Sequence, residues 1–484
     1  MKKQAFLLAI CAILGIIFVF LLLSDYNANW MHPEVTAFHI PYSLENGCVL
    51  SLKDLLKSFD SWEFDFQNSR PRFFSYFFQI INLKFRIWLF AFIPPHPSLS
   101  LTWIFTLLLS PFFLFRLVRN LSLNRVTAWI AVILYFLSPG FLSHLTLLFH
   151  PGKPLASFFT ILCLYLSSEI WLGIKVARTF NKKGYALFAL LLAIIFLAFI
   201  TDEVSFFIFF AVPLLFPEIF TLPPDKIRIS RYYRFTFIAF LLFLTFVVPW
   251  ITRHLGFGDF NFWDYIKRGG TGERYYLWKN MDIANLFLNG HYLLSSHIVP
   301  FRKPDLGRFF KLDIYAYAAF IFYCSYAYRR LSPAAKDIFK RLGLTLLAFI
   351  FFHFLISSRH LKLTTDCYYY GAVFSILFAI LLAILLTANT GALKIINGIL
   401  LAVFLVIFAS NFYAMNKRWI SSHNIWYKHF FPEAARIMPE EKRLDRNMVL
   451  TAWQHRKDKT YLQGVQKQFP LRADWLFVEL DYIK

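Results

Sequence analysis

Twelve apolar segments, most of them close to 20 residues long, dominate the chain. They fall at 5–24, 73–93, 99–118, 126–146, 154–173, 184–200, 204–221, 235–252, 312–328, 342–357, 369–387 and 394–413. A run of this length matches the hydrocarbon thickness of a bilayer, and continuous apolar runs favour helices over barrel strands. Hydrophobic residues make up 58% of the chain and charged residues only 16%, whereas globular domains carry about a quarter charged residues. We therefore expect an all-α polytopic membrane protein.

The segment at 73–93 differs from the others because it contains polar and charged side chains. Its sequence, FFSYFFQIINLKFRIWLFAFI, includes Lys84 and Arg86. An intramembrane Lys or Arg costs roughly 2.5–3.5 kcal/mol, whereas an aromatic-rich apolar face suits a helix that lies in the membrane interface. We therefore predict about 11 transmembrane helices, with 73–93 as an interfacial helix in the first outer loop.

The distribution of positive charge orients these spans. The net charge is +22, and most loop Lys and Arg residues fall on one side if the N-terminus is cytoplasmic. The short outer connections then hold only Lys153, Arg359 and Lys362; Lys417 and Arg418, after the last span, go against the rule. The pattern predicts a multi-pass protein of a bacterial inner membrane, and the charge requires no nucleic acid partner.

This orientation divides the chain into two domains. Residues 1–413 form the predicted transmembrane domain, with a first outer loop at 25–98 and a large outer loop at 254–311. Residues 414–484 form a soluble extracytoplasmic tail. The tail contains a short helical pattern and two strand-like runs, MVLTAW and WLFVEL, which predict a small α/β unit.

The order of motifs in the first half resembles the GT-C superfamily of integral-membrane glycosyltransferases. One span is followed by an acidic outer loop, then by RPRFFSYFFQIINLKF, and then by AWIAVILYFLSPGFLSHL. The family pattern is matched by Arg70-Pro71 at the start of the interfacial helix, Ser138-Pro139 at the end of a span, and the acidic pair Asp202-Glu203 in a later outer turn. The resemblance implies sugar transfer from a polyprenyl-phosphate donor to a glycan, lipid or protein acceptor on the extracytoplasmic face.

The first outer loop departs from the family in the spacing of its acids. Members often carry an adjacent acidic pair there, whereas Asp25 and Glu34 are nine residues apart. Sugar transfer needs a carboxylate that takes the proton of the acceptor hydroxyl. Glu34 is the first candidate for this base and Asp25 the second. A solvated loop acid and a polar helix stop remain the alternative interpretations of these two residues.

Cations at the same face are candidates for holding the donor phosphate as it leaves. Those predicted to bind substrate are Arg70, Arg359, His360 and Lys153. Snorkelling to lipid headgroups is the alternative for each. One of Asp202 and Glu203 is predicted to pair with a basic residue or to help bind an acceptor or a metal; the alternative is that the two acids only form a turn that breaks two apolar helices. The five cysteines and scattered histidines predict no metal site, although a divalent cation stays open as a cofactor.

Two other functions are compatible with this layout. A transporter or lipid flippase is the first, although such folds often consist of two repeated halves and the chain has no internal repeat. A non-catalytic GT-C-like partner in polysaccharide assembly is the second, because the adjacent acidic pair is missing. The enzyme remains our preferred prediction.

Overall fold

The computed structural model describes ten stretches of the chain, and all of its regular elements there are helical. The described residues are 74–85 in part, 101–141 without 103 and 123, 152–177, 182–221, 225–247, 250, 283–299, 311–357, 371–387 and 395–411. The predicted first span, most of the predicted first outer loop and the predicted C-terminal tail with its strands lie outside them. The all-helical prediction is confirmed for this part.

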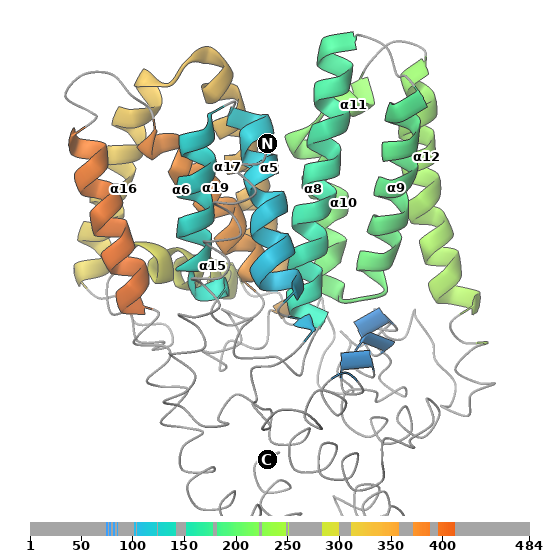
Figure 1. The fold of residues 1–484 in the computed structure, drawn as a ribbon. Coiled ribbons are helices and arrows are strands. Elements are labelled where there is room, and N and C mark those ends of the chain that lie inside the picture. Colours follow the sequence, from blue (N-terminus) through green and yellow to red (C-terminus); the bar gives the residue numbers. More distant parts are fainter. Residues whose placement is uncertain are drawn as a thin grey trace, which may run out of the picture.

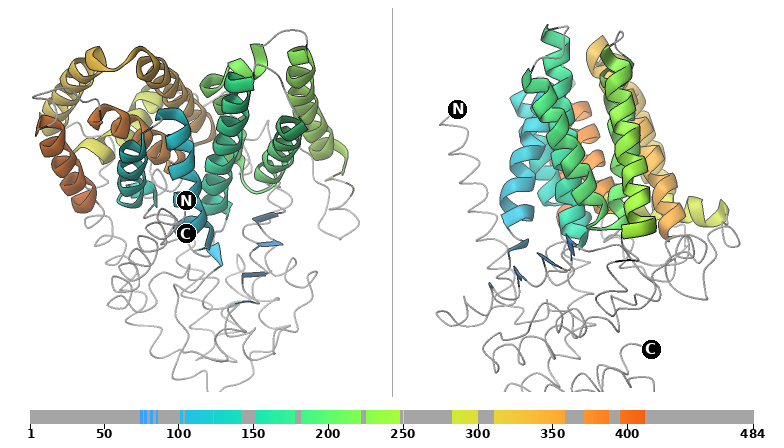
Figure 2. Two further views of the ribbon diagram at one scale, coloured as in Figure 1. Left: turned by 45° about the horizontal axis from the view of Figure 1, so that its top comes forward. Right: turned by 90° about the vertical axis from the view of Figure 1, so that its right-hand side faces the viewer.

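The helices follow one another in an up-and-down bundle (Figures 1 and 2). In the first half they are η2 (Ile104–Leu109, π-helical), α5 (Ser110–Ser122), α6 (Arg125–Phe136), α8 (Gly152–Ala177), α9 (Lys182–Phe199), the 3-10 helix η3 (Glu203–Phe206), α10 (Phe207–Leu215) and α11 (Glu218–Thr221). In the second half they are α12 (Asp225–Leu242), η4 (Phe243–Val247, π-helical), α15 (Ile283–Ile298), α16 (Lys311–Arg330), α17 (Pro333–Ser357), α19 (Ala372–Leu386) and the helix Ile395–Asn411.

Long-range hydrogen bonds identify the two ends of the bundle. At one end, the Gly140 N–H donates to Ser375 Oγ (3.2 Å) and the Asn411 side chain donates to the Val299 carbonyl (2.9 Å). The start of α8 and the turn before η3 lie there too, at the bottom of Figure 1; we call it the Asp202 end. At the opposite end, Thr127 and Thr387 share a hydrogen bond of 2.8 Å and Arg341 pairs with Glu218. We call this the Arg341 end.

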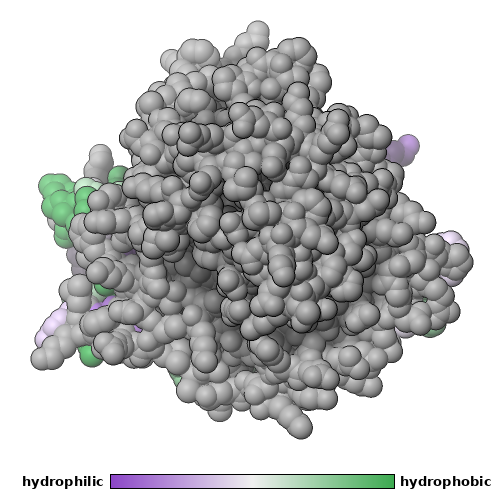
Figure 3. Space-filling view, turned by 90° about the horizontal axis from the view of Figure 1, so that it is seen from below, coloured by the Kyte–Doolittle hydropathy of each residue, from purple (hydrophilic) through white to green (hydrophobic). Residues whose placement is uncertain are grey.

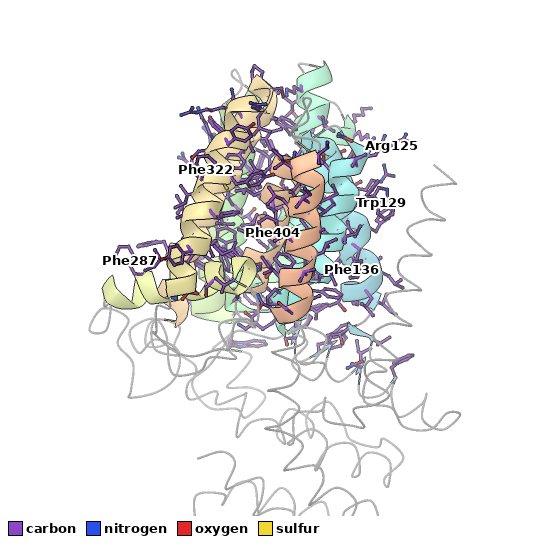
Figure 4. The ribbon with its side chains drawn as sticks, turned by 90° about the vertical axis from the view of Figure 1, so that its left-hand side faces the viewer. Arg125, Trp129, Phe136, Phe287, Phe322 and Phe404 are labelled. Carbon is purple, nitrogen blue, oxygen red and sulfur yellow. The ribbon has the colours of Figure 1, made fainter. Side chains whose placement is uncertain are left out.

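Helix α19 forms the centre of one half of the bundle. Every residue from Ala372 to Leu386 is buried, as expected for a helix that is apolar on all sides. It packs against α6, α17 and α16, and the Phe320 and Phe378 rings lie 5.7 Å apart between α16 and α19. Phe404 of the helix Ile395–Asn411 also faces the interior (Figure 4) and is 5% exposed.

Three helical segments are long and apolar enough to cross a membrane. They are Ile104–Leu121, Gly152–Lys175 and Lys182–Phe199. Four shorter apolar helices accompany them: Arg125–Phe136, Val204–Leu215, Ala372–Leu386 and Ile395–Asn411. Large apolar side chains remain exposed on several outer helices, and hydrophobic groups of described residues show at the rim when the Asp202 end is viewed face on (Figure 3). This surface suits a lipid environment.

The structure changes several predicted boundaries, and prolines account for two changes. The predicted segment 204–221 divides into η3, α10 and α11, and Pro217 accounts for the break between α10 and α11, because a proline interrupts a helix. The predicted segment 342–357 begins earlier, at Pro333, where the Ala335 N–H donates to Ser332 Oγ (3.3 Å). A proline in the first turn after a serine cap is a favoured helix start.

A further helix, α15, occupies part of the predicted outer loop 254–311. It lies crosswise under the bundle at the Asp202 end, with Phe287 at its outer side (Figure 4). The sequence predicted only a loop there, so this helix differs from the prediction. The described residues within 74–85 lie at the same end (Figure 1), where Phe78 contacts Phe105 with ring centroids 5.4 Å apart.

Candidate functional site

A buried ion pair joins two parts of the chain at the Asp202 end. Lys153 is the second residue of α8, and Asp202 directly precedes η3. Lys153 Nζ donates to Asp202 Oδ1 at 2.5 Å, and the two side chains are 1% and 0% exposed. Removing two charges from water is so unfavourable that such pairs contribute little net stability. The pair therefore marks this turn as a candidate functional site.

The local sequence explains how the Asp202 carboxylate is held. Asp202 Oδ1 also accepts a hydrogen bond from the Val204 N–H at 3.0 Å, the usual way in which Asp caps the start of a helical turn. The Thr201 hydroxyl donates to the Leu197 carbonyl and so ends α9 (2.6 Å). The backbone thus positions the carboxylate that accepts from Lys153.

Gly152 lets the start of α8 approach this turn closely. A Cβ added at Gly152 would lie 3.0 Å from Ser75 Oγ and 3.3 Å from Asp202 Oδ2. The Phe74 N–H donates to the Ile200 carbonyl (2.9 Å), and the rings of Phe74 and Phe159 lie 5.8 Å apart. The segment that follows Arg70-Pro71 is therefore attached to the Asp202 turn.

The late part of α17 packs beside the same turn. Phe207, the first residue of α10, directly follows η3. Its ring lies 4.9 Å from that of Phe349 and 6.0 Å from that of Phe352. Since α17 ends at Ser357, the chain leaves α17 only a few residues after this contact, in the direction of Arg359.

The structure brings together two of the predicted site residues. Lys153 and Asp202 form the ion pair, and both side chains lie inside the protein. Glu203 opens η3 beside them. The other candidates lie outside the described residues: Asp25, Glu34, Arg70, Arg359 and His360. Their roles stay predictions.

A second polar cluster at this end was missed by sequence reasoning. His297, near the end of α15, places Nδ1 2.8 Å from the Leu293 carbonyl and Nε2 2.9 Å from Ser375 Oγ. Because a carbonyl only accepts, Nδ1 carries the proton, and Nε2 accepts from the Ser375 hydroxyl. Burial lowers the pKa of His297 to about 4, so the imidazole is neutral near pH 7. The cluster fixes α15 to α19.

A third cluster connects α15 with the start of α16. His291 Nδ1 lies 2.7 Å from the Tyr317 hydroxyl, and that hydroxyl donates to the His291 carbonyl (2.9 Å). His291 Nε2 lies 3.7 Å from Asp313 Oδ2, and Asp313 is fully buried. The apolar spacing within α15 could have signalled the helix, but nothing in the sequence pairs these side chains.

Neither histidine belongs to a metal-binding group in the described part of the chain, where no three His, Cys, Asp or Glu side chains gather. Comparison of the chain with protein-family models, curated proteins and solved structures finds no match.

Proposed function

We propose that the chain is a membrane glycosyltransferase that uses a polyprenyl-phosphate sugar and works at its Asp202 end. The observation that carries the proposal is the convergence of three segments on the turn Ile200–Phe207. Phe74 binds the carbonyl of Ile200, Lys153 binds Asp202, and Phe352 packs on Phe207. Each segment leads to, or contains, a residue predicted to hold substrate.

Chain length limits how far two candidates outside the described residues can lie from the nearest described residue. Arg70 precedes Phe74 by four residues, which reach at most about 14 Å. Arg359 follows Ser357, the last residue of α17, by two residues, which reach at most about 7 Å. We therefore propose a shared phosphate-binding role for Arg70 and Arg359, together with His360, the next residue in the sequence.

The proposed reaction is a displacement at the anomeric carbon of the sugar. The acceptor oxygen forms the new bond to this carbon, and its proton goes to Glu34 or Asp25. The bond between the anomeric carbon and the phosphate oxygen breaks, and its electron pair leaves with the polyprenyl phosphate. Guanidinium groups stabilise the charge that develops on that phosphate, because they offer two parallel donors.

The ion pair has a positioning role in this proposal. Lys153 and Asp202 are buried, so they hold the turn that presents Glu203 and the neighbouring segments. An acid and a base at this depth also neutralise each other, which leaves Arg70 and Arg359 as the cations for the donor. In this proposal the acceptor approaches the same turn from the side of the predicted outer loops.

The membrane arrangement forms part of the proposal. Eleven spans, a cytoplasmic N-terminus and an extracytoplasmic tail would place the Asp202 end outside and the Arg341 end inside. The supporting observation is that many described cations occupy helix ends at the Arg341 end: Arg116, Arg119, Arg125, Lys175, Lys182, Lys183, Arg329, Arg330, Lys336 and Lys340. This agrees with the positive-inside rule.

Donor turnover by the purified full chain in proteoliposomes tests the function. A panel of polyprenyl-phosphate pentoses and hexoses is supplied, and release of free polyprenyl phosphate is measured. We expect turnover of at least one donor, and a loss of about 100- to 1,000-fold in Arg70→Ala and Arg359→Ala. Lys183→Ala, at the Arg341 end, should retain full activity as the matched cation control.

Three outcomes contradict the proposal. The first is turnover of no donor by well-folded protein, and the second is full activity in both arginine variants. The third is movement of intact lipid-linked sugar between leaflets without any glycosyl product, which would identify a flippase. Glu34→Gln and Asp25→Asn, assayed in parallel, identify the base.

A further inference from the structure

Four cations gather where α16 turns into α17, at the Arg341 end. Arg329 and Arg330 end α16, and Lys336 and Lys340 lie in the first turns of α17. Three of the side chains are exposed, and Lys336 is half-buried. We call these four residues the basic hairpin.

Two acids at the same end, Glu218 and Asp337, are paired with Arg341. Arg341 binds Glu218 through two hydrogen bonds of 2.7 and 2.6 Å, and its Nη2 lies 2.7 Å from Asp337 Oδ2. Among the ion pairs of the described residues, none involves a residue of the basic hairpin. The hairpin therefore presents an excess of positive charge to its surroundings.

Aromatic rings hold two of these cations at the level of the helix ends. The Arg330 guanidinium carbon lies 4.5 Å from the centre of the Tyr326 ring, and Lys336 Nζ lies 5.7 Å from the centre of the Tyr328 ring. Cation–π contacts of this kind restrict long side chains. Tyrosines also favour the membrane–water interface, so the cations sit at headgroup depth if α16 and α17 cross the bilayer.

Exposed apolar side chains continue from the cations along both helices. Leu344, Leu347 and Phe351 follow Lys340 at intervals of four, three and four residues and are 56%, 62% and 54% exposed. This spacing places them on one helix face. On α16, Phe322 precedes Arg329 by seven residues, is 75% exposed and points away from the bundle (Figure 4).

We propose that the basic hairpin is a binding site for an anionic phospholipid of the leaflet at the Arg341 end. The lipid phosphate contacts the cations, and the acyl chains lie along Leu344, Leu347 and Phe322. Charge complementarity selects the phosphate, and the adjoining apolar faces select a lipid over a soluble anion. The site is separate from the proposed glycosyl-transfer site and does not depend on it.

Lipid binding by the full chain tests this inference. Native mass spectrometry in detergent measures the binding of phosphatidylglycerol and phosphatidylcholine to the wild type and to two variants. Arg329→Gln/Lys340→Gln removes two cations of the hairpin. Lys182→Gln/Lys183→Gln removes two exposed cations at the start of α9, which makes it a control with the same change in net charge.

We expect preference for phosphatidylglycerol in the wild type and about 30-fold weaker binding in Arg329→Gln/Lys340→Gln, or about fivefold per cation. The control variant should lose less than threefold. Equal losses in both variants, or no lipid preference, would overturn the inference. Competition by millimolar glycerol phosphate as effective as that by lipid would overturn it as well, because the site would then take a soluble anion.

Discussion

Charged side chains at the two ends of the bundle stand in opposite physical settings. At the Asp202 end, Lys153 and Asp202 are fully buried and neutralise each other. At the Arg341 end, Arg329, Arg330 and Lys340 are exposed. Exposed cations follow from the preference of charge for water and lipid phosphate. A buried ion pair gains little stability, so its presence favours a functional role for the Asp202 turn.

Breaking the buried ion pair should have the largest effect on stability. Lys153→Met leaves the Asp202 carboxylate buried without its cation, and we expect a loss of about 3–5 kcal/mol in the free energy of unfolding. Lys153→Met/Asp202→Asn should recover most of this loss, because Asn still accepts from the Val204 N–H. Steric trapping in detergent measures the free energy of unfolding of both variants. A double variant as unstable as the single one would mean that the charge pair is not the cause.

Acidification should destabilise the Asp202 end through His297. Its pKa of about 4 lies below the ordinary 6.5, so the unfolded chain binds the extra proton first. The contribution of the neutral His297 imidazole to the free energy of unfolding is fully present above pH 6.5. It is lost as the pH falls towards 4, by about 3 kcal/mol in total. His297→Gln should flatten the dependence between pH 6.5 and 5, where carboxylates contribute less. An unchanged slope in this variant would show that another group titrates there.

Glycines at the two ends should respond to alanine with opposite signs. A Cβ at Gly140 would lie 2.5 Å from Ser375 Oγ and 2.6 Å from the Ala372 Cα, so Gly140→Ala should cost about 1–3 kcal/mol. Gly343, in α17 near Arg341, has nothing within 4 Å of an added Cβ. Gly343→Ala should stabilise the helix by about 0.5–1 kcal/mol. Thermal unfolding of both variants tests the two predictions. A stabilised Gly140→Ala would contradict the close approach of Gly140 to Ser375 and Ala372.

The smallest effect on stability is expected for the partly exposed ion pairs of Arg341 with Glu218 and Asp337. Arg341→Gln should cost about 1 kcal/mol, and salt should reduce the difference. Burial raises the pKa of Glu218, but hydrogen bonds from Arg341 and the backbone, together with the positive charges of Arg341 and Lys175, outweigh this and leave the pKa below its ordinary value. Its stabilising contribution is therefore present near pH 7 and disappears as the pH falls through the lowered pKa. A loss as large as that of Lys153→Met would remove the contrast between the two ends.

The sequence predicted the helices better than the contacts between them. The run of apolar residues at 369–387 is long and uninterrupted, so α19 was found where it was expected. The Asp202 turn was also placed between two helices, because polar residues interrupt the apolar pattern there. Hydropathy, however, does not report which helices touch. Lys153 and Asp202 are 49 residues apart, and His297 and Ser375 are 78 apart, so only the packed structure pairs them.

Helix α15 was missed for a different reason. Its sequence, IANLFLNGHYLLSSHI, contains Asn, Gly, Ser and His among the apolar positions, and no span-length apolar run draws notice to it. Pairing with Tyr317, Ser375 and the side chain of Asn411 satisfies its polar groups at the Asp202 end. Those partners come from three other helices, and a local pattern contains no information about them.

Photo-crosslinking to the full chain tests the central claim most directly. A polyprenyl phosphate that carries a diazirine near its phosphate is activated in proteoliposomes, and the labelled peptides are identified by mass spectrometry. The account predicts labels that gather on 70–82, 200–207 and 355–360 and disappear in excess unmodified polyprenyl phosphate. Competable labelling confined to the Arg341 end, with none near Asp202, would contradict it.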